Sequence, residues 1–264
     1  MNELGANDPL RLRALEAIAR DAGMLAHRYF IKRDQLKIEL KGPQDLVSEA
    51  DREVEKYVRT SLRELFPNDA MLGEEHGLEG DADQGCWVID PIDGTFSFLN
   101  GLQSWCVSIA YVRHGQAQLG VIYDPNAREL FSARLGGPAT LNGQPIRVAD
   151  VGSLNEGSVF VGFSHRRQPH EVMPALGQLL EGGGMFHREG SGALGLAWTA
   201  AGRLIGYVEA HMMPWDCLAG LCLIEAAGGN FRPYLDDRAL AQGNPVVAGP
   251  TKLLPELERL LTAS

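Results

Sequence analysis

Apolar residues near the start of the chain recur with the spacing of an amphipathic helix. The residues that share this spacing are Leu15, Ile18, Ala22, Leu25 and Tyr29. Asp8 can cap such a helix, and Pro9 suits its first turn. We therefore predict a long helix that begins near Pro9. After it, apolar and polar residues alternate over residues 35–40, which predicts a short strand, and residues 41–43 are predicted to form a loop.

Ser48 and Asp51 have the spacing of a capping box, in which each side chain satisfies a backbone N–H group at the start of a helix. The sequence after them predicts a second helix. Its inward positions are predicted to be Val54, Val58, Leu62 and Leu65. Pro67 cannot continue a helix and therefore predicts its end.

Between residues 87 and 145, short apolar runs alternate with turn residues. The runs predict strands over residues 87–89, 106–112, 119–123 and 130–133. Asn142-Gly143 is typical of a hairpin turn. Connections this short join antiparallel strands, because a parallel crossover needs a dozen or more residues.

After Asp150, strands and helices alternate instead. We predict strands over residues 159–163 and 204–209, and helices over residues 170–180, 191–201 and 215–227. Gly228-Gly229 is predicted to end the last helix. The change in pattern predicts two lobes, an α+β lobe with an antiparallel sheet over residues 1–150 and an α/β lobe over residues 151–264.

Composition narrows the class of protein. The 264 residues are 45% apolar and 22% charged, which is typical of a globular protein. With 24 Lys and Arg against 34 Asp and Glu, the net charge is −10, so we expect neither nucleic acid nor an anionic membrane as a partner. No apolar stretch approaches the roughly 20 residues that span a bilayer. The first 13 residues lack the apolar core of a signal peptide, and the four cysteines form no CxxC pair, so we predict a cytoplasmic protein with reduced thiols.

The densest candidate chemistry lies just after the predicted strand at residues 87–89. Asp90 and Asp93 follow this strand, Gly94 allows a tight turn, and Thr95 can begin a helix. Carboxylates and a carbonyl oxygen are ligands that suit Mg²⁺. Backbone N–H groups at a helix start bind phosphate. This one segment can therefore hold both halves of a metal-assisted phosphoryl site, although a bare Asp-Gly pair is more often only a turn.

Two further acidic motifs favour the metal interpretation. Glu74-Glu75 lies in a loop after Gly73, and Asp216 begins an otherwise apolar helix. Each motif alone has an ordinary explanation, because a loop carboxylate is usually solvated and an acid in a first turn stabilises the helix dipole. Sequence spacing does not establish that these acids converge.

Taken together, the motifs resemble the inositol monophosphatase family of Mg²⁺-dependent, lithium-sensitive phosphatases. The motifs that carry the resemblance are Gly73-Glu74-Glu75, Asp90-Pro91-Ile92-Asp93-Gly94-Thr95, Trp215-Asp216-Cys217-Leu218-Ala219-Gly220 and Glu225-Ala226-Ala227-Gly228-Gly229. The likeness extends through residues 41–51 and 190–209. It implies a layered αβαβα sandwich, a hydrolase with two or three Mg²⁺ ions, a small phosphorylated substrate and a homodimer.

The resemblance also implies roles for individual residues. The implied metal ligands are Glu74, Asp90, the Ile92 carbonyl, Asp93 and Asp216. Glu74 and Thr95 would orient a water molecule for in-line attack on phosphorus, and Asp51 would bind the Thr95 hydroxyl. The implied substrate contacts are Asp93, Gly94, Thr95, Gly190, Ser191, Gly192, Glu209 and Asp216. Lys41 matches the family's mobile active-site loop approximately, because that loop is one residue shorter in this chain.

The alcohol part of the substrate is less well specified than the phosphate. Glu209 resembles the acid that accepts hydrogen bonds from a polyol, which favours an inositol monophosphate. The alternatives are histidinol phosphate, adenosine 3′,5′-bisphosphate and fructose 1,6-bisphosphate. The histidinol and nucleotide branches often have Lys after the Asp-Gly-Thr core, where this chain has Phe96-Ser97-Phe98.

Two other interpretations concern the whole chain and its remaining polar residues. A non-catalytic binding protein would be expected to have lost ligand acids, and all of the matched acids are present. His76 and His211 lie near the acidic motifs and could touch substrate, but a surface or helix-end position is the favoured interpretation. Arg166-Arg167 could meet an anionic substrate or a partner subunit, but a solvated loop is the favoured interpretation.

Overall fold

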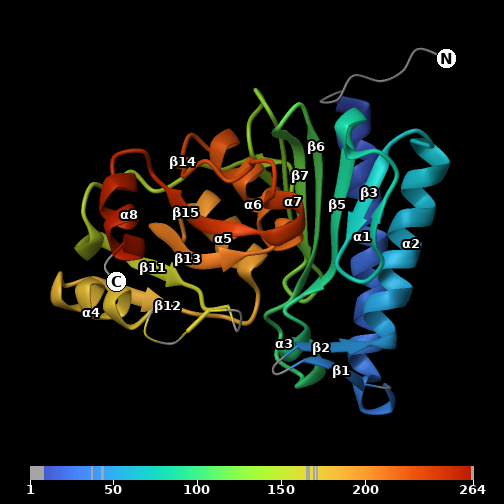
Figure 1. Ribbon diagram of the computed structural model, residues 1–264, viewed down its shortest axis with the longest axis horizontal. Coiled ribbons are helices and arrows are strands. Elements are labelled where there is room, and N and C mark those ends of the chain that lie inside the picture. The colour runs from blue at the N-terminus through green and yellow to red at the C-terminus, as the bar shows by residue number, and fades with distance from the viewer. Residues whose placement is uncertain are drawn as a thin grey trace.

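Helices and sheets alternate in five layers. The computed structural model describes residues 9–36, 38–42, 45–164, 167–168, 170 and 172–262. Figure 1 shows helices α1 and α2 on one side of an eight-stranded sheet, α5 and α6 between this sheet and a five-stranded one, and α4 and α8 on the far side. The predicted αβαβα sandwich is confirmed.

The first helical layer forms as the apolar periodicity predicts. Helix α1 spans Pro9–Ile31 and α2 spans Glu49–Leu65, and the predicted capping box of Ser48 and Asp51 is present. One predicted inward residue is wrong, because Leu65 is 54% exposed. It lies in the last turn of α2, and the next residue, Phe66, is buried there instead.

The segment between these helices differs from the prediction. A 3₁₀ turn, η1, spans Arg33–Gln35, and strand β1 covers Ile38–Gly42 and pairs antiparallel with β2, Asp45–Ser48. The strand therefore begins later than predicted, because α1 continues to Ile31 and the 3₁₀ turn follows it. Lys41 and Gly42, predicted to lie in a loop, form the end of β1, and Pro43 lies outside the described residues.

The larger sheet has the strand order β10-β9-β8-β7-β6-β5-β3-β4. Its strands are β3 Ala70–Gly73, β4 Gly77–Glu79, β5 Cys86–Asp93, β6 Cys106–Arg113, β7 Gln116–Asp124, β8 Glu129–Arg134, β9 Thr140–Leu141 and β10 Gln144–Pro145. The predicted antiparallel pairing from β5 to β8 is confirmed, whereas β3 runs parallel to β5. Asn142 and Gly143 both have positive φ and join β9 to β10, as the hairpin prediction requires.

The smaller sheet has the order β12-β11-β13-β15-β14. Its strands are β11 Ser158–Val161, β12 Met185–His187, β13 Gly206–Met212, β14 Asn230–Phe231 and β15 Asn244–Gly249. The remaining helical segments are η2 Ala82–Gln84, α3 Thr95–Leu99, η3 Leu154–Glu156, α4 Met173–Glu181, α5 Gly192–Ala200, α6 Pro214–Ala226, α7 Ala239–Gln242 and α8 Leu254–Thr262. The elements predicted after residue 150 are present with shifted ends; for example, α4 begins at Met173 rather than at residue 170.

Apolar cores fill the spaces between these layers. One core includes Leu15 and Val58 of the outer helices and Trp87 and Ile89 of β5, all buried. A second surrounds α5 and α6, so both faces of β5 are covered and all eight of its residues are buried. Asp90 and Asp93 therefore lie at the end of a strand that is packed on both faces. Within the part of the chain that the structure describes, no helix is both long and apolar enough to cross a membrane.

Candidate active site

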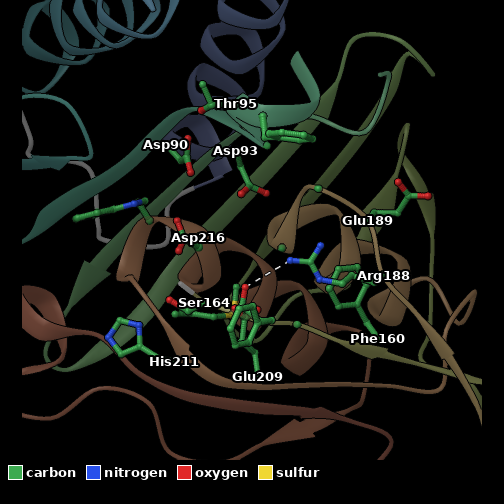
Figure 2. Close-up of a pocket in the computed structure, with 18 of the residues that line it drawn as sticks. Asp90, Asp93, Thr95, Phe160, Ser164, Arg188, Glu189, Glu209, His211 and Asp216 are labelled. Carbon is green, nitrogen blue, oxygen red and sulfur yellow. Dashed lines mark hydrogen bonds between the residues drawn. The ribbon is translucent and has the colours of Figure 1, made fainter. Parts of the chain in front are cut away.

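A cavity of about 220 Å³ opens where the end of β5 meets the start of α6 and the strands of the smaller sheet. Residues of both sheets and of the helical layer between them line it (Figure 2). The lining residues that carry polar or charged side chains are Glu74, Asp90, Asp93, Thr95, Ser164, Arg188, Glu189, Glu209, His211 and Asp216. Acidic side chains therefore predominate in a cavity of a size suited to a small molecule.

The end of β5 brings two carboxylates into this cavity. The pairing of β5 with β6 shifts register between Asp90 and Asp93, and such an irregularity turns side chains away from regular alternation. The Ile92 N–H donates to Asp90 Oδ1 at 3.0 Å, which fixes the Asp90 carboxylate against its own strand. Gly94 follows with φ +97°, a conformation that favours glycine, and α3 begins at Thr95 as predicted.

Asp216 reaches the same place from the helical layer between the sheets. It lies in the first turn of α6, and its Oδ2 accepts the Met213 N–H at 3.1 Å. Asp90, Asp93 and Asp216 each offer an oxygen atom, and these atoms lie within 4.8 Å of one another. The structure thus brings Asp216 to two acids more than a hundred residues before it in the sequence, and the oxygen atoms of all three are the kind that hold Mg²⁺.

Glu74 approaches from the next strand. It follows β3 directly, its N–H donates to the Ile89 carbonyl at 3.2 Å, and it lines the cavity. Glu74 is not one of the three acids with the closest oxygen atoms, but its charge acts on Asp90. The acids expected from the resemblance to meet in one site therefore do so.

The electrostatics of the cluster fit a bound cation. Burial raises the pKa of Asp90 well above its usual range, and the charges of Glu74, Asp93 and Asp216 raise it further. Burial also raises the pKa of Asp93 to about 6, against the opposing effect of hydrogen bonds from Ser191 and Ala193. Carboxylates that repel one another in a buried site are stabilised by a divalent ion placed between them. The donor set fits Mg²⁺.

Thr95 and Asp51 form the contact that the resemblance implies. The Thr95 Oγ1 lies 3.2 Å from Asp51 Oδ1 and 3.0 Å from the Ile92 carbonyl oxygen, so the hydroxyl can donate to either. Asp51 is fully buried, and its Oδ2 accepts both the N–H of Ser48 at 2.8 Å and its hydroxyl at 2.7 Å. Burial raises the pKa of Asp51. The same carboxyl group thus caps α2 and contacts Thr95.

The other end of the cavity contains the residues expected to contact the organic part of a substrate. Gly190, Gly192 and Glu209 line it. Ser191 is not among the lining residues; its side chain is fully buried, and its hydroxyl donates to Asp93. Glu209 accepts a hydrogen bond from the Tyr207 hydroxyl at 2.6 Å, and burial raises the pKa of Glu209 to about 7. Lys41 is the second-last residue of β1, and its side chain lies outside the described residues.

At this end, Arg188 was not predicted from the sequence, and a place in the site was the less favoured interpretation of His211. The Arg188 guanidinium donates to the Phe163 carbonyl at 3.5 Å and is close enough to Glu209 to lower that pKa (Figure 2). His211, interpreted as a surface or helix-end residue, instead lies on β13, lines the cavity and contacts the Gln242 carbonyl through Nε2 at 2.7 Å. Neither belongs to a local motif, since only the meeting of β13 with the segment before α5 places them in the site.

The remaining residues weighed from the sequence lie elsewhere. The Nδ1 of His76 is 3.2 Å from Glu55 Oε1, and His76 is not among the cavity-lining residues. Arg167 is exposed, and Arg166 lies outside the described residues. Cys217, next to Asp216, is fully buried, and burial raises the pKa of its thiol well above the ordinary value, so it is not an activated nucleophile.

Fold and site together define the class of this protein. It is a layered α/β protein whose cavity places a carboxylate cluster beside a turn at a helix start, an arrangement that suits metal-assisted chemistry on a phosphate ester. More particularly, the chain belongs to the inositol monophosphatase family, whose sequence description matches residues 8–263.

Individual relatives agree with this assignment. The chain is 37% identical over 255 residues to a protein of Xylella fastidiosa named Nus factor SuhB, covering 93% of this chain and 92% of the relative. It is also 37% identical over 245 residues to an inositol-1-monophosphatase of Mesorhizobium japonicum, covering 89% and 92%. The crystal structure of the extragenic suppressor protein suhB from Bartonella henselae superposes with a TM-score of 0.89 at 31% identity, covering 96% of this chain and 98% of that chain.

Proposed function

We propose that the protein is a Mg²⁺-dependent phosphomonoesterase that hydrolyses a small polyol phosphate, an inositol monophosphate above all. The observation that carries this proposal is the convergence of Asp90, Asp93 and Asp216 within 4.8 Å beside the turn at Gly94 and Thr95. Relatives of equal identity carry the names inositol-1-monophosphatase and Nus factor SuhB, so similarity alone does not select an enzymatic function. The intact set of acids supports it, since a binding protein that had lost turnover would not need to keep them.

The proposed metal ligands are the carboxylates of Glu74, Asp90, Asp93 and Asp216 and the carbonyl oxygen of Ile92. When bound there, two or three Mg²⁺ ions would neutralise charge on the phosphate and make a nearby water more acidic. The backbone at Gly94 and Thr95 would bind phosphate oxygens, because N–H groups at a helix start point outward without partners in the helix.

The side chains around the phosphate would guide the reaction. Thr95, held by Asp51, would orient a water molecule in line with the ester bond. The water oxygen forms a bond to phosphorus, the ester P–O bond breaks, and Glu74 accepts the proton that the water loses. The departing alcohol oxygen takes its proton from solvent. Inorganic phosphate and the free alcohol are the products.

Glu209 is the proposed contact for the substrate's alcohol part. Its carboxylate is held by Tyr207 and faces the cavity at the end away from the acid cluster, where it would accept hydrogen bonds from neighbouring hydroxyls of a polyol. The same carboxylate would pair with the ammonium group of histidinol phosphate, which is the second candidate. Adenosine 3′,5′-bisphosphate and fructose 1,6-bisphosphate are less favoured candidates.

The proposal extends to partners and location. The net charge of −10 gives the chain no general attraction for nucleic acid, and the four cysteines are free and buried, as expected of a protein in the reducing cytoplasm. Exposed apolar side chains gather on α4 and the edge strand β12, which supports a homodimer. These side chains are Met173, Leu180, Met185 and Phe186.

The test is phosphate release by the purified protein from a panel of esters. The panel holds inositol 1-phosphate, histidinol phosphate, adenosine 3′,5′-bisphosphate and fructose 1,6-bisphosphate, each assayed with Mg²⁺ and with a chelator. We expect release that depends on Mg²⁺, is inhibited by Li⁺ and has its highest kcat/KM with inositol 1-phosphate. Release from none of the esters would contradict the proposed activity, and a higher kcat/KM with another ester would reassign the substrate alone.

A further inference from the structure

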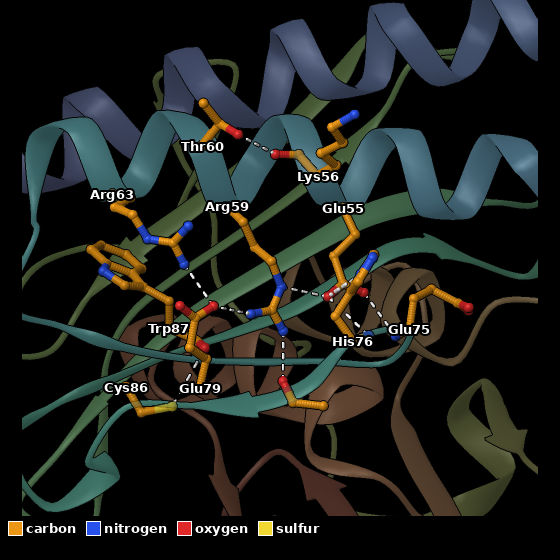
Figure 3. Close-up of polar contacts among 11 residues, drawn as sticks. Glu55, Lys56, Arg59, Thr60, Arg63, Glu75, His76, Glu79, Cys86 and Trp87 are labelled. Atoms are coloured by element: carbon orange, nitrogen blue, oxygen red, sulfur yellow. Dashed lines mark hydrogen bonds and ion pairs between the residues drawn. The ribbon is translucent and has the colours of Figure 1, made fainter.

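Helix α2 presents three buried polar residues one turn apart on the face that meets the site. Asp51, Glu55 and Arg59 are 0%, 0% and 6% exposed, and their spacing of four residues aligns them along one side of the helix. Asp51 contacts Thr95, as described above. Glu55 and Arg59 contact the turn between β3 and β4, which carries Glu74 (Figure 3).

The Glu55 carboxylate accepts hydrogen bonds from the backbone of that turn. Its Oε2 accepts the Glu75 N–H at 2.7 Å, and its Oε1 accepts the His76 N–H at 3.3 Å. The same Oε1 accepts a hydrogen bond from Arg59 Nε at 2.6 Å. Both carboxylate oxygens are therefore engaged, and the two N–H groups that they bind belong to the residues directly after Glu74.

The turn is fastened at its two ends as well. Before Glu74, the Glu55 carboxylate packs directly on Gly73, where an added Cβ atom would overlap Oε1 and would displace the carboxylate. After it, Arg59 Nη2 donates to the Gly77 carbonyl at 2.6 Å. The N–H of Glu74 itself is held by the Ile89 carbonyl of β5. The backbone that carries Glu74 is thus tied to α2 on one side and to the strand of Asp90 and Asp93 on the other.

We propose that Glu55 is a positioning residue that aims Glu74 at the metal site, with Arg59 holding the Glu55 carboxylate in place. Because Asp51 is one turn away on the same helix, α2 fixes Glu74 and Thr95 in register with each other. The inference rests on the proposed function in that Glu74 must be a metal ligand and the proton acceptor.

The energetics of the pair agree with a geometric role. Burying a carboxylate and a guanidinium removes both from water, so a buried ion pair is a poor source of net stability. The buried pair of Glu55 and Arg59 does restrict the turn beside it, because every buried polar atom of the pair requires a hydrogen-bond partner in a defined direction. Groups that orient metal ligands in this way typically change metal affinity or activity by about 10–100-fold when they are replaced.

The central experiment compares Glu55→Gln with Arg63→Gln. The glutamine has the shape of the glutamate, but its amide NH₂ group cannot accept the N–H or guanidinium donors that face one of the two carboxylate oxygens. Arg63 lies one turn beyond Arg59 and pairs with Glu79 at 2.6 Å, so its replacement breaks an ion pair beside the network without touching Glu55. Mn²⁺ binding is measured by titration calorimetry, and kcat, KM and the metal-free melting temperature are measured alongside.

We expect Glu55→Gln to weaken Mn²⁺ binding and to lower kcat, each by about 10–100-fold, with KM for the ester changing little. Arg63→Gln should match the wild type in all of these. Wild-type Mn²⁺ affinity and kcat in Glu55→Gln would overturn the inference. A wild-type protein that binds Mn²⁺ but hydrolyses no ester would instead contradict the proposed function, while the Mn²⁺ affinities would still decide the role of Glu55.

A double-mutant cycle separates positioning from a general structural effect. In a Glu74→Gln background, Glu55→Gln should cause little further loss of Mn²⁺ affinity, because the group on which it acts is already altered. In an Asp216→Asn background it should cause its full loss, because Asp216 arrives on α6. Equal losses in the two backgrounds would overturn the assignment to Glu74. If Glu55→Gln does not fold, Arg59→Lys serves instead in the same cycle with the same two criteria, since the single nitrogen of lysine cannot take the places of both Nε at Glu55 and Nη2 at Gly77.

Discussion

Asp93 on β5 accepts the N–H of Ala193, the second residue of α5, at 2.7 Å across 100 positions of sequence. The same oxygen, Oδ2, also accepts the Ser191 hydroxyl. Two donors on one oxygen leave Oδ1 as the oxygen better placed for a cation. A strand of the larger sheet and the helical layer beside the smaller sheet are thus joined at the centre of the proposed metal site.

Asp93→Asn has only one oxygen, so it should lose either the proposed metal ligand or this junction. If the amide keeps its oxygen on Ala193 and Ser191, it turns its NH₂ group toward the cation, and kcat/KM should fall at least 100-fold, since residues that merely orient ligands already account for about 10–100-fold. Steady-state phosphate release with saturating Mg²⁺ measures the effect.

Asp124→Asn is the matched control for this variant. Asp124 is a buried acid of β7, and its Oδ1 accepts the N–H groups of Asn126 and Ala127, which an asparagine oxygen can also accept. It is not among the residues lining the cavity. Its activity should stay within about threefold of wild type. Full turnover by Asp93→Asn would contradict the metal assignment.

The metal-free protein should lose stability as pH rises from about 5 to 8. The folded state raises the pKa of Asp93 to about 6 and of Glu209 to about 7, mainly through burial, and raises that of Asp90 as well. Over this range the folded state binds more protons than the unfolded chain, so the free energy of unfolding falls with pH by about 1.4 kcal/mol per unit of pKa difference. The stabilisation is complete below the ordinary carboxyl pKa and is lost as pH passes the raised values.

Added Mg²⁺ should remove much of this loss, because the ion stabilises the charged form of the cluster. Thermal unfolding followed by circular dichroism at pH 5.5, 6.5 and 8, with chelator or with Mg²⁺, checks both statements. A melting temperature that Mg²⁺ does not change at pH 8 would count against a metal site at these acids.

The sequence predicts those parts of the fold that local patterns determine. The capping box of Ser48 and Asp51, the hairpin at Asn142-Gly143 and the helix start at Thr95 each depend on a few neighbouring residues, and each is confirmed. The helix period does not determine which residue completes the inward face in a last turn, and Phe66 is buried there while Leu65 is exposed.

Some residues of the candidate site could likewise be predicted from local motifs, and others could not. Motifs that resemble a family locate Asp90, Asp93 and Asp216, whose meeting the structure shows. Arg188 and Glu55 have no such motif. Tertiary packing places the Glu209 carboxylate near Arg188 and the backbone N–H of Glu75 beside Glu55. These neighbours are about 20 residues away in the sequence, so no local motif shows the contacts.

Glu209→Gln should separate the two leading candidate substrates. With an inositol phosphate the glutamine oxygen can still accept hydrogen bonds from neutral hydroxyls, so only the difference between a charged and a neutral acceptor is lost, about 1 kcal/mol per bond, and KM should rise by about 5-fold per bond. With histidinol phosphate the Glu209 carboxylate would pair with an ammonium group, a contact worth about 1.5–3 kcal/mol, and kcat/KM should fall by about 10–150-fold. Parallel assays of the wild type and the variant with both esters give the fold-change in kcat/KM for each, and the ratio of the two fold-changes identifies the substrate.

Tyr207→Phe provides the comparison for Glu209→Gln. It removes only the hydroxyl that holds the carboxylate and keeps the negative charge, so it should affect the two substrates to a similar degree. A glutamine variant that hydrolyses both esters at the wild-type rate would show that Glu209 does not contact the alcohol part.

Gly94→Ala should damage the site by a route that involves no charge. The residue has φ +97°, and a Cβ atom there would lie 2.6 Å from the Ser104 carbonyl oxygen and 3.3 Å from the Trp105 Cα atom. The backbone at Ser104 and Trp105 or at the turn between Asp93 and Thr95 has to move to relieve this contact.

Gly143→Ala is the control, because Gly143 has φ +79° with nothing within 4 Å of its added Cβ atom. The control should lose only the left-handed penalty of about 1–2 kcal/mol in the free energy of unfolding, with normal turnover. Gly94→Ala should lose more stability than that in urea unfolding and should lose most of its phosphate release, whereas equal stability and activity in the two variants would show that the close approach at Gly94 is not required.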